Sequence, residues 1–134
     1  MSAWQIEYST EYQPSPLSYW VHRHIDNEIW SDASLFEPPL PKPIIGKGYP
    51  RLRLTFANSD LWFSSPEEVS HFIAVLGQKN MPTSLQLSAK RDTKHGPNSH
   101  WLSRLPSKLK PWSKREKITK IAVKALIEYE SLYR

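Results

Sequence analysis

Eleven lysine and arginine side chains between residues 90 and 124 form the largest group in this sequence with a definite chemical capacity. They are Lys90, Arg91, Lys94, Arg104, Lys108, Lys110, Lys114, Arg115, Lys117, Lys120 and Lys124, and only Asp92 and Glu116 oppose them. Such cations neutralise phosphates and release counterions, which gives nucleic-acid affinity that is independent of base sequence. Eight of the eleven are lysines, which favours diffuse phosphate contact, because bidentate recognition of guanine prefers arginine. The set predicts contact with DNA or RNA, or with an acidic protein or nucleoprotein surface.

Aromatic side chains lie among these cations. Trp101, Trp112 and His100 could stack on unpaired bases if they are exposed. The competing interpretation is a solvated surface whose lysines keep a helix soluble, with Trp101 and Trp112 in the core. Both interpretations stay open at this point.

A second group, His22, His24 and Asp26, has the ligand types of a catalytic metal site. Residues i, i+2 and i+4 of a strand share one face, so the three could converge. However, they would be spread along a line, whereas a metal needs a compact cluster. Surface histidines that pair with carboxylates such as Glu28 are favoured instead, and we predict no metal and no cofactor.

Two further groups could belong to an enzyme. His95 and His100 flank a turn-forming segment at 96–99 and could present a general base, but no nucleophile of known geometry accompanies them. Glu67 and Glu68 are paired carboxylates, yet a helix start explains both. Because no group combines nucleophile, base and oxyanion donors, we predict a protein without catalytic residues.

Composition limits the architecture. The chain has 134 residues with 39% apolar side chains, which suits a single domain over 1–134. Twelve prolines accompany only four glycines, and the absence of cysteine excludes disulfides and thiolate metal sites. The first residues do not resemble a secretory signal, and the longest apolar run, Phe72 to Leu76, is too short to span a bilayer. We expect a soluble cytoplasmic protein with no membrane contact.

Charge divides the chain into two parts. Residues 79–134 hold 13 Lys and Arg against four Asp and Glu, whereas residues 1–78 hold five against nine. An asymmetry of this kind is informative about partners rather than about fold. The basic part at 79–134 is therefore where we expect a partner to bind.

Periodicity predicts strands in the first half of the chain. Trp4, Ile6 and Tyr8 alternate with polar residues, and 19–25 is a second candidate strand. Five prolines at 37–50 exclude a helix or a central strand there, so this segment should be extended. Residues 51–63 alternate on both sides of Asn58-Ser59-Asp60, which predicts a hairpin.

Two helices should pack on these strands. Ser65 is a predicted N-cap, followed by Pro66 and by Glu68 as the capping-box acid, and Gly77 ends the helix. The resulting strand–strand–helix unit spans Arg51–Gly77. Ser113 and Glu116 repeat the capping-box pattern before an amphipathic helix over Lys114–Tyr133, whose Lys114, Lys117, Lys120 and Lys124 cluster away from the apolar face. The prediction is an α+β fold: a small antiparallel sheet, the ββα unit, and the C-terminal helix packed on it.

Two functions follow from this prediction. The first is a non-enzymatic accessory protein that contacts nucleic acid or a nucleoprotein complex by neutralising phosphates with its C-terminal part. The alternative is a protein-interaction module, such as a small inhibitor or adaptor, that docks its basic face on an acidic protein surface.

Overall fold

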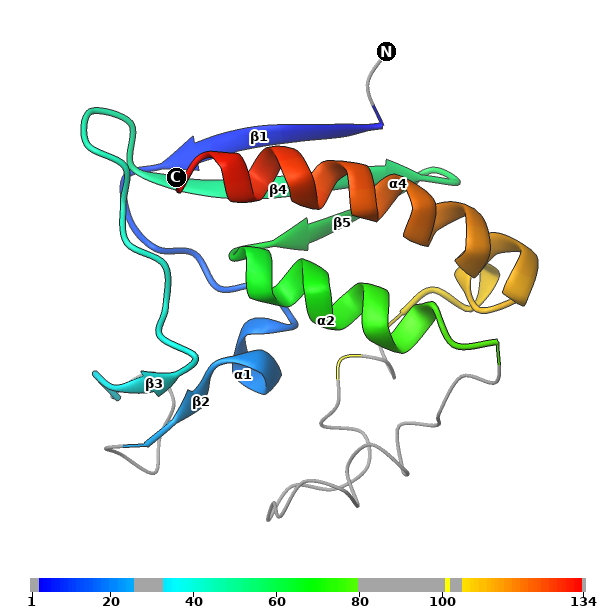
Figure 1. The fold of residues 1–134 in the computed structure, drawn as a ribbon, viewed down its shortest axis with the longest axis horizontal. Helices are drawn as coiled ribbons and strands as arrows, with labels where there is room; N and C mark the ends of the chain where they lie inside the picture. The colour runs from blue at the N-terminus through cyan, green and yellow to red at the C-terminus, as the bar shows by residue number, and fades with distance from the viewer. Residues whose placement is uncertain (1–2, 26–32, 80–100, 102–104, 134) are drawn as a thin grey trace.

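A three-stranded antiparallel sheet forms the centre of the fold. The structure is a computed structural model that describes residues 3–25, 33–79, 101 and 105–133. Strands β1 (Trp4–Ser9), β4 (Tyr49–Phe56) and β5 (Ser59–Phe63) are hydrogen-bonded in the order β1-β4-β5. Figure 1 shows helices α2 (Pro66–Leu76) and α4 (Trp112–Ser131) side by side on one face of this sheet. The predicted α+β fold, with its ββα unit and its packed C-terminal helix, is confirmed.

Alternation decides which face of the sheet is covered. Leu52 lies opposite Ile6 on one side and Phe63 on the other, and Leu52 and Phe63 are completely buried. The intervening side chains point to the opposite face, since successive residues of a strand alternate. The helices therefore pack on the apolar face, and the polar face of the sheet is left to the outside.

The hairpin turn lies one residue earlier than predicted. Strands β4 and β5 are joined by Ala57 and Asn58, with φ angles of 50° and 63°. Two successive positive φ angles are the geometry of a two-residue hairpin turn, which matches the twist of the strands. The predicted turn at 58–60 was wrong because Ser59 and Asp60 already pair with Phe56 and Thr55.

The predicted strand at 19–25 was also wrong for most of its length. Residues Ser18–Val21 form a short helix, α1, and only Arg23–His24 form a strand, β2, which pairs with β3 (Phe36–Glu37). The helical turn is fixed by Ser18, whose hydroxyl oxygen accepts the Ser15 N–H at 2.9 Å while the Val21 N–H donates to the Leu17 carbonyl at 2.9 Å. A buried polar side chain at position 18 overrides the alternation. The proline-rich segment at 37–50 contains no helix, as expected, but its last two residues, Tyr49 and Pro50, are the first residues of β4, the central strand of the sheet. The prediction that excluded a central strand was wrong there, because Pro50 lies near the start of the strand, where a proline is tolerated.

The two long helices begin differently. Helix α2 starts after Ser65, as predicted, and the Ser65 hydroxyl accepts the Glu68 N–H at 3.3 Å. Helix α4 starts at Trp112, after Pro111, and has no side-chain cap. Ser113 is thus inside the helix, and the prediction of a second N-cap there was wrong.

The core joins α4 to the sheet. Tyr129, Phe72, Ile118 and Leu54 are among its completely buried side chains. The Tyr129 hydroxyl donates to the Pro50 carbonyl oxygen at 2.8 Å, which ties the last turns of α4 to the start of β4. Helix α4 is therefore rigidly placed, and the residues on its outer side have fixed positions relative to the sheet.

Candidate functional site

Seven of the eleven predicted cations are described, and six of these lie on or beside the outer side of α4. Lys108, in the 3₁₀ helix η4 (Ser107–Leu109), is exposed, and Lys110 is half-buried. Lys114, Lys117, Lys120 and Lys124 are exposed along α4, which is the arrangement that their spacing predicted. We call these six residues the basic surface. It extends from η4 along α4 as far as Lys124, and one of its members forms a salt bridge, at 3.3 Å between Lys120 and Glu116.

The charges of α4 run against its dipole. The N-terminal end of a helix carries a partial positive charge, so acids are stabilising in the first turn and bases in the last. In α4 the first turn has no acid and the last has no base; Lys114 lies near the start, and Glu128 and Glu130 lie near the end. Each of these charges opposes helix stability. The distribution concentrates positive potential at one end of α4.

Among the described members of the predicted set, Arg115 is the one that is buried. It is 5% exposed, and its guanidinium donates to the carbonyl oxygens of Leu76 at 3.2 Å, Lys79 at 3.0 Å and Gln78. Its Nε also donates to the Lys110 carbonyl at 2.7 Å. The carbonyls of Leu76, Gln78 and Lys79 lie at and just after the end of α2, where helix carbonyls have no partner within the helix. Arg115 therefore caps α2 from α4.

The two candidate stacking tryptophans differ. Trp101 is 4% exposed and its ring packs against Phe72 in the core, so it cannot stack on a base. Trp112 is half-buried at the start of α4, with the Arg115 guanidinium 5.1 Å from its ring centroid. Lys90, Arg91, Lys94, His100 and Arg104 lie outside the described residues, as does the loop between His95 and His100.

A buried polar cluster surrounds Glu68, which sequence reasoning assigned only to a helix start. Glu68 is completely buried at the first turn of α2. Its carboxylate accepts hydrogen bonds from the hydroxyls of Ser15, Ser18 (2.9 Å) and Ser65 (3.2 Å), and from the Ser64 N–H at 3.1 Å. Four donors satisfy the carboxylate, as a buried charge requires. Pairs of serines at 15/18 and 64/65 were the only trace of this cluster in the sequence.

His22 completes the cluster. It is completely buried, so the prediction of a surface histidine was wrong for His22; the carboxylate beside it is that of Glu68, and Glu28 lies outside the described residues. Its Nδ1 donates to the Pro38 carbonyl oxygen at 2.8 Å, its Nε2 lies 2.6 Å from the Ser65 hydroxyl oxygen, and Nε2 is 3.6 Å from Glu68 Oε2. Burial acts to lower the pKa of His22, but the bond to Glu68 and the bond to the Pro38 carbonyl outweigh it, and the pKa is raised.

A serine hydroxyl next to an imidazole is also the pairing of a nucleophile and its base. Here both Ser65 and His22 have no exposed surface, and the Ser65 hydroxyl already caps α2. The arrangement binds the N-terminal segment, the proline-rich segment and α2 together. The cluster of Glu68, His22 and the serines therefore stabilises the fold. Within the described part of the chain, no three His, Asp or Glu side chains are placed to hold a metal ion.

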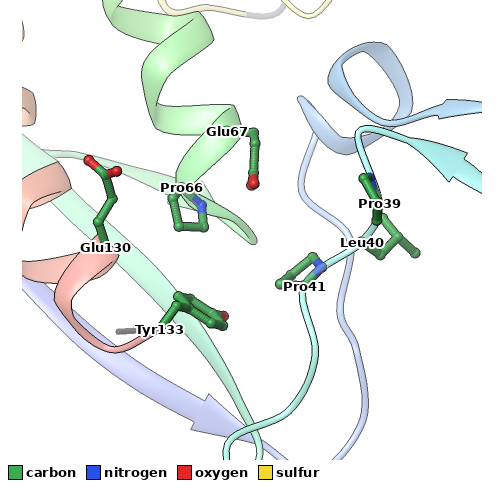
Figure 2. A pocket seen from close by; sticks show the side chains of 7 residues that line it. All are labelled: Pro39, Leu40, Pro41, Pro66, Glu67, Glu130 and Tyr133. Carbon is green, nitrogen blue, oxygen red and sulfur yellow. The ribbon is translucent and has the colours of Figure 1, made fainter.

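A shallow cavity of about 410 Å³ lies close to the cluster. Figure 2 shows it between the proline-rich segment, the start of α2 and the end of α4, with Glu67, Glu130 and Tyr133 around it. Burial, and then the nearby Glu67 carboxylate, raise the pKa of Tyr133 to about 12. The cavity has no lysine or arginine in its lining and is acidic, so it is unsuited to a phosphate.

The outer face of the sheet carries a cationic aromatic group that sequence reasoning also missed. Trp62 lies opposite Arg53, and the guanidinium carbons of Arg51 and Arg53 are 4.5 and 5.7 Å from its ring centroid. Arg53 is also paired with Glu7 at 3.2 Å. The alternation of Arg51 and Arg53 opposite Trp62 in the hairpin was the available signal. Because Glu7 and Asp60 offset the arginines, this face is close to neutral.

In the described part of the chain, no helix is both long and apolar enough to cross a membrane. Comparison with protein-family models, with curated proteins and with solved structures finds no match for this chain.

Proposed function

We propose that the basic surface binds the phosphate backbone of a nucleic acid, and that the protein acts in the cytoplasm as a non-enzymatic accessory to a nucleic acid or nucleoprotein complex. The observation that carries the proposal is the position of the lysines. Lys108 and Lys110 lie just before the positive end of α4, and Lys114 lies in its first turn, where a positive charge opposes helix stability instead of supporting it. A surface that only has to be hydrated needs charged side chains, but it does not need positive charges at the N-terminal end of a helix.

Two features of the basic surface support diffuse phosphate contact. Lys117 and Lys124 are exposed, and among the described residues neither has an ion-pair partner. The described members of the surface are all lysines, because Arg115 is used inside the fold. A lysine is a point charge without the planar fork that reads a base edge, so the surface is suited to phosphates in any sequence.

The test is a salt titration of binding to mixed-sequence DNA and RNA. Log affinity should fall by about 0.7–0.9 per phosphate contact for each tenfold rise in salt. Lys117→Ala or Lys124→Ala should each reduce that slope by about one unit and leave sequence preference unchanged. Lys42→Ala, at an exposed lysine of the proline-rich segment, is the matched control and should leave the slope unchanged.

The alternative partner is an acidic protein surface. In that case the same two substitutions should slow association with the protein partner and leave nucleic acid unaffected. The absence of any complex with DNA or RNA at micromolar protein and low salt would reject the nucleic-acid proposal in favour of this alternative.

A further inference from the structure

Helix α4 has an outward stripe that shares only Lys120 with its basic surface. Glu116, Lys120, Val123, Ile127 and Glu130 follow one another at steps of four, three, four and three residues, which places them on one side of a helix. All five are exposed; Val123 is 45% exposed and Ile127 is 61% exposed. The apolar side of α4 is already buried against the sheet and α2, so these two side chains have no role in the core. Figure 1 shows α4 with α2 beside it and its far side away from α2.

Two copies of this stripe match each other in apolar contacts and in charge when the two helices run antiparallel. With Ala125 as the midpoint, Val123 and Ile127 lie at equal distances on either side, and so do Lys120 and Glu130. A two-fold axis at this point brings Val123 of one helix to Ile127 of the other, and Lys120 of one helix to Glu130 of the other. Each contact occurs twice, as in every isologous interface. We propose that this stripe binds the same stripe of a second copy of this chain, in antiparallel orientation.

Charge complementarity selects the second copy and its direction. A parallel pair would bring Lys120 to Lys120 and Glu130 to Glu130, which is repulsive at both positions. The antiparallel pair has an apolar centre with an ion pair of opposite sign at each end. Lys120 now contacts Glu116 within its own helix at 3.3 Å, and both side chains are largely exposed. Such a pair contributes little, so Lys120 can turn to Glu130 of the second copy at small cost.

The dimer is weak and leaves the basic surface free except for Lys120. The apolar centre consists of two side chains from each copy, which is far below the content of a standard interface of about 800 Å² per partner. We expect a dissociation constant on the order of 0.1 mM. Lys117 and Lys124 both lie about a quarter of a turn around the helix from the stripe, on the same side of it, given about 100° per residue, so they are next to the contact and not in it.

The experiment is a charge exchange followed by sedimentation equilibrium, on nuclease-treated protein free of nucleic acid. Wild type should dimerise with rising concentration. Lys120→Glu and Glu130→Lys should each weaken dimerisation about tenfold or more, because two ion pairs become two like-charge contacts. An equimolar mixture of these two variants should recover the wild-type affinity, since both contacts between them again join opposite charges. The double variant K120E/E130K should recover it alone.

Two controls separate this contact from other causes. Lys124→Glu makes the same change in net charge off the stripe and should dimerise like wild type. Ile127→Ala removes exposed apolar surface without changing charge and should weaken the dimer while the circular dichroism and melting temperature stay unchanged. Monomeric wild type up to about 1 mM, ten times the expected dissociation constant, would overturn the proposal. So would a dimer that the single reversals leave intact, or a mixture of the two variants that stays monomeric.

Discussion

Helices α2 and α4 share the pattern Ser-x-x-Glu at their predicted starts but use it in opposite ways. In α2, Ser65 caps the helix and Glu68 is buried among hydroxyl donors. In α4, Ser113 and Glu116 are exposed inside a helix that begins at Trp112 without a side-chain cap. The charges of α2 stabilise the fold, whereas those of α4 oppose its helix dipole and face outward. The same four-residue pattern therefore stabilises the fold in α2, where its Glu is buried, whereas in α4 both its residues stay on the surface, where a partner could reach them.

The strongest test of this contrast is the pair Glu68→Ala and Glu116→Ala. Removing the Glu68 carboxylate leaves buried serine donors and His22 without their acceptor, which should lower the free energy of unfolding by about 3–5 kcal/mol. Glu116→Ala, at the same position of the repeated pattern, should change it by less than about 0.5 kcal/mol. Urea denaturation of both variants measures the difference. Equal effects would mean that the Glu68 cluster is not what holds this region together.

Arg115 is the point where the two helices depend on each other. Arg115→Met keeps much of the buried side-chain length but removes every donor to the carbonyls at the end of α2. We expect a loss of about 3 kcal/mol, because hydrogen bonds from a buried charged group are among the stronger ones. Lys117→Met, two residues along the same helix and exposed, is the control. Hydrogen exchange should show the loss first in the last turn of α2; protection that is unchanged there would contradict the capping role.

Local patterns predicted the fold well where the side chains act locally. The hairpin, α2 and α4 follow from alternation, capping and apolar periodicity, each within a few residues. The Glu68 cluster could not be predicted, because its partners Ser15 and Ser18 are 53 and 50 residues away in the chain. For the same reason Arg115 was placed in the basic surface: its acceptors at Leu76 and Gln78 lie 39 and 37 residues earlier. The lysines were placed correctly on the outside because helical spacing alone determines their side of α4.

The matched serines give a smaller and cleaner comparison. Ser65→Ala should cost about 0.5–2 kcal/mol, since the N-cap of α2 loses its acceptor. Ser113→Ala should be neutral or slightly stabilising, because alanine is the better residue inside a helix. Thermal unfolding of the two variants side by side checks this. A loss at Ser113 as large as that at Ser65 would show that Ser113 has a capping role after all.

The buried His22 makes the α2 end of the fold sensitive to pH. Its pKa is raised above the ordinary value of about 6.5, so the folded state binds a proton more tightly than the unfolded chain does. The stabilisation is complete below the unfolded pKa and is lost as the pH rises through the higher folded pKa. The free energy of unfolding should therefore decrease as the pH rises above about 6.5, the ordinary pKa of histidine. In His22→Asn this part of the pH dependence should disappear; a wild-type curve that instead rises over the range would refute the assignment.

The smallest expected change in stability tests the α4 side and links it to the proposed function. Lys114 is at the third position of α4, where an acid is favoured by the helix dipole. Lys114→Glu should therefore raise the free energy of unfolding by about 0.3–1 kcal/mol while it weakens binding to DNA or RNA. Lys124→Glu makes the same change of charge far from the helix start, so it should weaken binding without raising stability. A gain of stability with unchanged binding would remove Lys114 from the basic surface. If Lys114→Glu does not raise the free energy of unfolding, then Lys114 does not oppose the helix dipole, and the basic surface is no different from an ordinary solvated surface.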